Sequence, residues 1–242
     1  MIETVMSSFP AIFTTVYGFS LLFHFLGRRR PQDLLLYLAF IFHTIYQLST
    51  GYYGGGLYIF LQTVENPGFL PWAAASILIA GKVKGDSDWV WDLSLVVVFI
   101  LSVIVLLTPR SLAYFGPNKL TVWTVLFFVT NSFAEALFFI GGLQALLFLF
   151  GKGNSRVYHW CLVYGFLSHT FSHVAGSIWC FLGWANTFQW VYVHLQSAGI
   201  WMYYANYLHL AFRASWDERK RAYYAVVGIV LIACYKYVFQ AI

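Results

Sequence analysis

Charge is what this chain of 242 residues has least of. Only 10% of its residues are charged, whereas 60% are hydrophobic and 21% are aromatic. An ordinary soluble domain is roughly one quarter charged, and an interior of this size could not hide so much apolar surface. The composition therefore excludes a soluble domain and predicts a membrane protein. The net charge of +5 is scattered in short clusters, which disfavours a nucleic-acid partner.

Motifs for metal-dependent and nucleotide-dependent chemistry are also missing. No Asp-Asp or Asp-x-x-x-Asp pair lies wholly within a predicted helix, so a magnesium–diphosphate site is not expected. The sequence has no Gly-x-x-x-x-Gly-Lys, His-Glu-x-x-His or Gly-x-Ser-x-Gly. Its three cysteines are isolated in apolar segments, which indicates small buried side chains. We therefore expect no metal site and no cofactor.

Long apolar runs, by contrast, fill most of the chain. A transmembrane helix needs about 20 apolar residues. Eight candidate segments follow one another: Ser8–Gly27, Leu34–Tyr53, Pro67–Gly81, Trp89–Leu107, Leu120–Phe150, Val157–Trp184, Trp190–Phe212 and Ala222–Val238. The stretch Gly54–Glu65 stays unassigned, and whether the last segment forms a full helix is left open. We predict an all-α, polytopic membrane bundle of seven or eight helices, with residues 1–242 in one transmembrane domain and no internal repeat.

Basic residues test this division, because Lys and Arg collect in short cytoplasmic loops. With the N-terminus on the non-cytoplasmic side, only Arg110 and Lys119 fall in the opposite loops. The cytoplasmic loops then hold Arg28, Arg29, Arg30, Lys82, Lys84, Lys152, Arg156, Arg213, Arg219, Lys220 and Arg221. One missed helix would move every later loop to the other side of the membrane, and this asymmetry would be lost. No basic residue precedes the first apolar run, so we expect no cleaved signal peptide.

An ionisable residue at membrane depth is a candidate for function. Most of the nine acids occupy loops or helix ends, with Asp92 just inside the fourth apolar segment and Glu65 at the mouth of the third. Glu135 differs, because it lies near the middle of Leu120–Phe150 with Asn131 one turn before it on the same face. Its carboxyl is either a proton donor or a hydrogen-bonded contact to another helix.

Histidines form the next group of candidates. His169 and His173 are four residues apart, so they share a helix face and could ligate a metal or relay a proton. His194 and His209 are 15 residues apart, roughly 22 Å along a helix, which suits haem ligands near the two membrane faces. Hydrogen-bonded contacts between helices remain the alternative for all four.

The 10 Trp, 17 Tyr and 24 Phe exceed what the membrane-interface belts require. Aromatic faces stabilise cations in a dry cavity, and a carbocation is the intermediate that most needs such a lining.

The sequence resembles the integral-membrane terpene cyclases of the paxilline and pyripyropene type. The anchors of the resemblance are Tyr46-Gln47-Leu48-Ser49-Thr50-Gly51, Asp88-Trp89, Gly141-Gly142-Leu143 with Asn154-Ser155-Arg156, and Trp184-x-x-x-Phe188-x-Trp190. They are similar, in order, to that family's Trp-Glu-x-x-Tyr-Gly, its acidic-Trp pair, its Gly-Gly-Leu run with a Ser/Arg loop, and its last-helix Trp and Phe pattern. This chain departs from the family pattern at both of the family's acids. Gln47 stands where the family has a Glu, and the position of the family's second acid falls near Asn206 or His209.

The resemblance implies a metal-independent meroterpenoid cyclase, an enzyme of the isomerase or lyase type. It would protonate an epoxide or olefin and guide carbocation ring closure. Because Gln47 cannot donate the proton, we expect Glu135 to be the catalytic acid, with Asp92 and Glu65 as the next candidates. The expected substrate-binding residues are Gln47, His43, Tyr46, Asn131, Trp184, Trp201, Tyr204, Asn206 and His209. The expected partners are a lipophilic small molecule and membrane lipid, the expected location is the endoplasmic reticulum, and the oligomeric state is left open.

Two alternatives use the same residues. The chain could bind or transport a small lipophilic ligand without reacting with it. It could instead be a haem-bearing electron carrier that uses His194 and His209, in which case the purified protein would show a Soret band.

Overall fold

The computed structural model describes residues 2–52, 68–83, 93–107, 121–188 and 192–235. These residues form eight α-helices and no strand: α1 (Ile2–Phe25), α2 (Arg29–Tyr52), α4 (Phe69–Val83), α6 (Leu95–Leu107), α7 (Val122–Leu149), α8 (Ser155–Trp184), α9 (Tyr192–Leu210) and α10 (Glu218–Ala233). Each predicted segment overlaps one of these helices, so the prediction of an all-α helical bundle is confirmed. The stretch Gly54–Glu65 lies outside the described residues.

The chain is an integral membrane protein with several spans. Three of the described helices, α1, α2 and α7, are long and apolar enough to cross a bilayer, and α4 and α6 are shorter apolar helices. Large hydrophobic side chains point outward along the helices, for example Phe19, Leu34 and Leu167, each more than half exposed. Outward-facing apolar side chains of this density need lipid around them.

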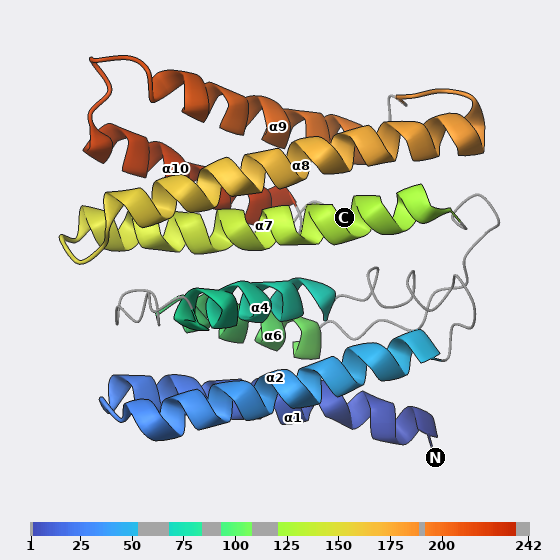
Figure 1. Ribbon diagram of the computed structural model, residues 1–242, viewed down its shortest axis with the longest axis vertical. Coiled ribbons are helices and arrows are strands. Elements are labelled where there is room, and N and C mark those ends of the chain that lie inside the picture. The colour runs from blue at the N-terminus through green and yellow to red at the C-terminus, as the bar shows by residue number, and fades with distance from the viewer. Residues whose placement is uncertain (1, 53–67, 84–92, 108–120, 189–191, 236–242) are drawn as a thin grey trace. The chain divides into compact units, whose positions relative to one another are not determined.

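The chain divides into two compact units, residues 1–128 and 129–242. In the first unit α1 runs beside α2, and α4 beside α6 (Figure 1). The α1–α2 turn is short because Gly27 takes a left-handed conformation. Side-chain hydrogen bonds join the helices: Thr14 of α1 donates to the Ser102 carbonyl of α6, and Trp72 of α4 donates to Thr44 of α2.

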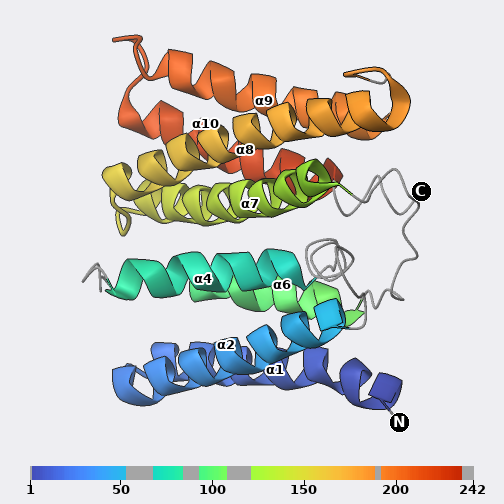
Figure 2. The ribbon, with the colours of Figure 1, turned by 45° about the vertical axis from the view of Figure 1, so that its right-hand side comes forward.

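In the second unit α8 lies along α7 on one side and along α9 on the other (Figure 2). Its first turn is capped by Asn154, whose side chain accepts a hydrogen bond from the backbone N–H of Arg156. The helix ends at Trp184, and the next residue, Ala185, is left-handed with φ of 52°. Asp217 caps α10 in the same way, by accepting from the N–H of Lys220.

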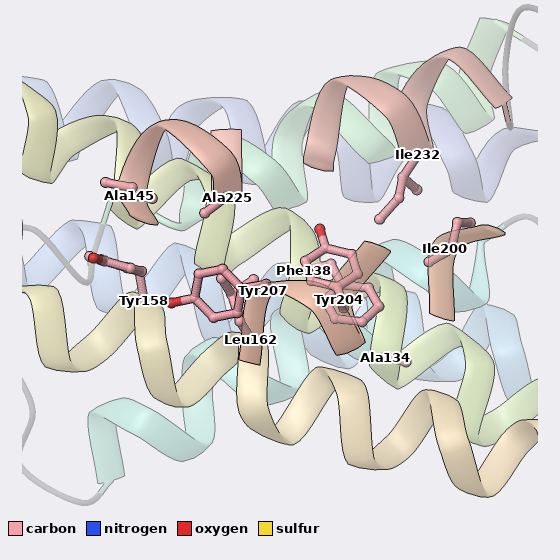
Figure 3. Packing of buried hydrophobic residues seen from close by; sticks show 11 residues of the cluster. Ala134, Phe138, Ala145, Tyr158, Leu162, Ile200, Tyr204, Tyr207, Ala225 and Ile232 are labelled. Atoms are coloured by element: carbon pink, nitrogen blue, oxygen red, sulfur yellow. The ribbon is translucent and has the colours of Figure 1, made fainter. Parts of the chain in front are cut away.

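Aromatic side chains fill the interior of the second unit (Figure 3). Phe138 of α7 stacks in parallel on Tyr204 of α9, with 3.7 Å between ring centroids, and neither side chain is exposed by more than 1%. The cluster continues with buried residues of all four helices, which are Ala134, Ala145, Tyr158, Leu162, Ile200, Tyr207, Ala222, Ala225 and Ile232. This cluster holds α8 and α9 in the register that positions the histidines.

The loops predicted to be cytoplasmic meet at one end within each unit. In the first, Lys82 at the end of α4 forms an ion pair with Asp33 at the start of α2. In the second, Ser155 and Tyr158 at the start of α8 both donate to Glu218 at the start of α10. The side of the membrane on which these loops lie stays a prediction.

Candidate functional site

Two histidines of α8 converge on one residue of α9. As the spacing predicted, His169 and His173 lie on the same helix face, with ring centroids 4.7 Å apart. Nε2 of each ring lies 3.3 Å from the Ser197 carbonyl oxygen, and the Ser197 hydroxyl lies 3.1 Å from Nε2 of His173. One backbone carbonyl thus holds both imidazoles between α8 and α9.

The carbonyl fixes the proton position on His169. Because a carbonyl oxygen only accepts, Nε2 of His169 carries the ring proton and Nδ1 presents a lone pair. His169 is 2% exposed, and its buried Nδ1 has no hydrogen-bond partner among the residues that the structure describes. A buried acceptor without a partner costs free energy. Nδ1 would therefore be stabilised by a ligand that donates a hydrogen bond to it, or by a proton that binds to it.

Glu135 of α7 belongs to the same neighbourhood. Its Oε1 accepts a hydrogen bond of 2.9 Å from Nδ2 of Asn131, so the predicted pair on one helix face is present. The Glu135 carboxyl is half-buried, and it lies close enough to His169 for its charge to act on that ring. A carboxyl beside an imidazole can exchange a proton with it.

A further histidine, His194, lies near the start of α9. His194 acts electrostatically on His173, and its Nε2 lies 3.6 Å from the thiol sulfur of Cys180 on α8. Phe188 approaches the same ring, with 5.5 Å between centroids. Among the described residues, no group of three or more His, Cys, Asp or Glu side chains is arranged to hold a metal ion.

Three predicted substrate-binding residues lie in the first unit instead. His43 is fully buried, stacks on Phe13 at 3.9 Å and lies 2.9 Å from the Gly68 carbonyl through Nε2. Gln47 lies one turn further along α2, with its amide nitrogen 3.5 Å from that ring. Tyr46 packs on Phe13 and His43. The predicted set is thereby divided between two units, with Glu135 in the second.

The remaining predicted residues of the second unit have structural contacts. Trp201 donates to Thr170, Tyr204 stacks in the core, and Asn206 donates to the Tyr224 hydroxyl at an exposed position. Trp184 is 47% exposed at the end of α8. His209 donates through Nδ1 to the Ala205 carbonyl of its own helix. Asp92 and Glu65 lie outside the described residues.

Ser197 is not among the predicted residues, because its contact with the histidines depends on its backbone carbonyl. Cys180 was interpreted only as a small buried side chain, which it is, and its proximity to His194 depends on how α9 returns along α8. Tyr17, which contacts His43, looked like any aromatic residue of an apolar helix.

Comparison with known proteins gives partial relatives. No known protein-family profile matches the chain. It is 32% identical over 94 residues to a cytochrome c biogenesis protein CcsA of Parasynechococcus marenigrum, which covers 38% of this chain and 31% of the relative. CcsA proteins of Prochlorococcus marinus and a Synechococcus species are each 38% identical over 72 residues, or 29% of this chain. The match covers about a third or less of the length of these relatives.

These relatives overturn the resemblance to terpene cyclases. They carry the name of a different family, so the meroterpenoid cyclase function, the terpene substrate and the role in terpenoid biosynthesis are wrong. The anchors were short runs of Gly, Trp and Phe, which recur in aromatic-rich membrane helices by composition alone. The relatives are bacterial, and bacteria have no endoplasmic reticulum, so that location has no support.

Proposed function

We propose that this chain is a membrane protein of cytochrome c biogenesis whose cargo is haem. The observation that carries the proposal is the similarity, over as many as 94 residues, to proteins named for cytochrome c biogenesis. Cytochromes c contain haem, and imidazole is a common ligand of haem iron. The haem interpretation of His194 and His209 agrees with this similarity better than an enzyme of terpene chemistry does.

Each end of α9 has a histidine that would serve as a haem ligand. At one end, Nδ1 of His209 donates to a backbone carbonyl, which leaves Nε2 as the basic atom, and such a bond orients imidazoles that bind metals. Arg213 follows in the next loop, and guanidinium groups bind carboxylates such as the haem propionates. By the distribution of basic residues this end is cytoplasmic and the N-terminus is not.

At the other end, Phe188 contacts the His194 ring, and the Cys180 thiol of α8 lies 3.6 Å from it. Phe181 and Trp184, each about half exposed, follow Cys180 within little more than one turn of α8. A flat porphyrin packs on such faces. The two histidines are roughly 22 Å apart along the helix, too far to ligate one iron. We infer that each would hold haem near one membrane face.

Haem titration tests the proposal. The full chain, purified in detergent, is titrated with haemin and followed by its Soret band. We expect about two haems per chain, and about one in either His194→Ala or His209→Ala, because each removes one axial ligand. His24→Ala, which changes a histidine of the first unit, is the control and keeps both.

A cellular measurement tests the biological part. Deletion of the gene should abolish covalently bound haem in c-type cytochromes, as seen by haem staining of membrane proteins, and the wild-type chain should restore it. A wild-type protein that leaves the haemin spectrum unchanged would contradict the haem cargo. Normal c-type cytochromes in the deletion strain would contradict the role in biogenesis.

A further inference from the structure

The two units repeat one local arrangement. Their second helices carry the same short pattern, Phe40-x-x-His43-Thr44 in α2 and Phe166-x-x-His169-Thr170 in α8. Counted from Arg29 and from Ser155, each histidine is the fifteenth residue of its helix. The next helix of each unit supplies a tryptophan, Trp72 in α4 and Trp201 in α9.

The contacts match one for one. Each threonine hydroxyl donates to the carbonyl of the phenylalanine four residues earlier, at 2.7 and 2.8 Å. Each tryptophan Nε1 donates to that threonine, at 2.9 and 3.0 Å. Each histidine Nε2 lies 2.9 or 3.3 Å from the carbonyl of the residue four before the tryptophan, Gly68 or Ser197. The shared residues are too few to stand out as a repeat in an apolar sequence.

The first copy is closed around its histidine. Nε2 of His43 donates to the Gly68 carbonyl, so Nδ1 is the acceptor, and the Tyr17 hydroxyl lies 3.4 Å from it. Phe13 covers one face of the ring. One turn further along α2 stands Gln47, which does not titrate. Among the described residues, no charged side chain acts on His43.

The second copy differs at these positions. In the described part of the chain, Nδ1 of His169 has no hydrogen-bond partner, whereas Nδ1 of His43 has Tyr17. The residue one turn on is His173 where the first copy has Gln47. Glu135 from α7 acts on His169, and His194 from α9 acts on His173. Of the described residues of α10, none contributes a charge to either ring.

We propose that the second copy is a proton-binding site, in which His169 and His173 share an exchangeable proton beside Glu135. A hydronium ion gives its proton to Nδ1 of His169 and leaves as water, while the Nε2–H of His169 stays bonded to the Ser197 carbonyl. The neutral imidazole thereby becomes an imidazolium. The proton passes between His169 and His173, whose ring centroids are 4.7 Å apart. Chains of Glu and His at membrane depth serve such relays in other proteins.

Nitrogen NMR of ¹⁵N-histidine-labelled protein tests the site. The full chain in lipid nanodiscs is titrated with acid, and the Nδ1 signals of His169 and His173 are followed. We expect the two to move together in coupled steps, because neighbouring titrating groups share their protonation. The Nδ1 signal of His43 should stay constant over the same range, so it also reports that each variant has folded.

Two variants separate the proposal from a purely structural contact. Glu135→Gln should weaken proton binding at His169 about tenfold, because it removes a nearby negative charge. His173→Gln, which places in the second copy the residue found in the first, should leave a single step at His169. His24→Gln assigns its own signal and should change neither. A His169 signal that stays as constant as that of His43, or that ignores Glu135→Gln, would overturn the proposal. Both variants keep His194 and His209, so this outcome is independent of haem binding.

Discussion

Truncation of Phe138 to alanine should lower the free energy of unfolding by about 4 kcal/mol. Phe138 is fully buried and stacks on Tyr204, and its ring lies against Gly165 so closely that a Cβ there would stand 2.8 Å from it. In a bilayer, helices are held together by such packing rather than by removal of apolar surface from water. The variant removes a ring on which α7, α8 and α9 all converge.

Unfolding in mixed micelles with increasing SDS, followed by circular dichroism, measures this effect. Phe181→Ala is the matched control, because Phe181 is 56% exposed on α8 and its loss opens no internal cavity. We expect the control to stay within about 0.5 kcal/mol of the wild type. Equal losses from the two variants would show that the stacked pair does not support the second unit.

Replacement of Gly142 by alanine should cost about 2–3 kcal/mol and loosen α10. A Cβ at Gly142 would lie 2.2 Å from Cγ2 of Ile229, so α10 has to move away from α7 or Ile229 has to change its rotamer. Glycine is therefore required at this crossing for close approach of the helices.

Gly199→Ala provides the control for helix propensity. Gly199 also lies inside a helix, α9, but a Cβ there meets no atom of the described residues within 4 Å, so alanine should be neutral or stabilising. Adding Ile229→Ala to Gly142→Ala should recover part of the loss, since it removes the clashing branch. If the double variant is as unstable as the sum of the two single variants, the contact between α7 and α10 does not limit stability.

The helices could be predicted because each one is determined by its own stretch of the sequence. Apolar runs interrupted by short basic or glycine-containing loops leave the chain few ways to satisfy its backbone in lipid, so all eight segments were found. Their ends were missed by up to six residues, as at α6, because capping and terminal turns depend on single side chains. The division into two units left no mark in composition, since both are built from the same kinds of residue.

The site could be predicted only along single helices. The pairs His169 with His173 and Asn131 with Glu135 follow from spacing on one helix, and both are present. The sequence could not place Ser197 against the two imidazoles, because that contact depends on how α9 packs on α8. That Gln47 and Glu135 serve one site stays a prediction, because they belong to different units. The family assignment failed for a related reason, since short aromatic motifs report membrane composition more than ancestry.

The threonine of each copy makes two hydrogen bonds that few other amino acids could make in its place. Its hydroxyl gives one hydrogen bond to a phenylalanine carbonyl and receives one from a tryptophan. Lipid offers no substitute for either bond, and valine, although equal in shape, would leave the indole N–H unsatisfied. Only serine preserves both bonds. Natural variation at Thr44 and Thr170 should therefore be confined to two amino acids, and each threonine and its tryptophan should be lost or kept together.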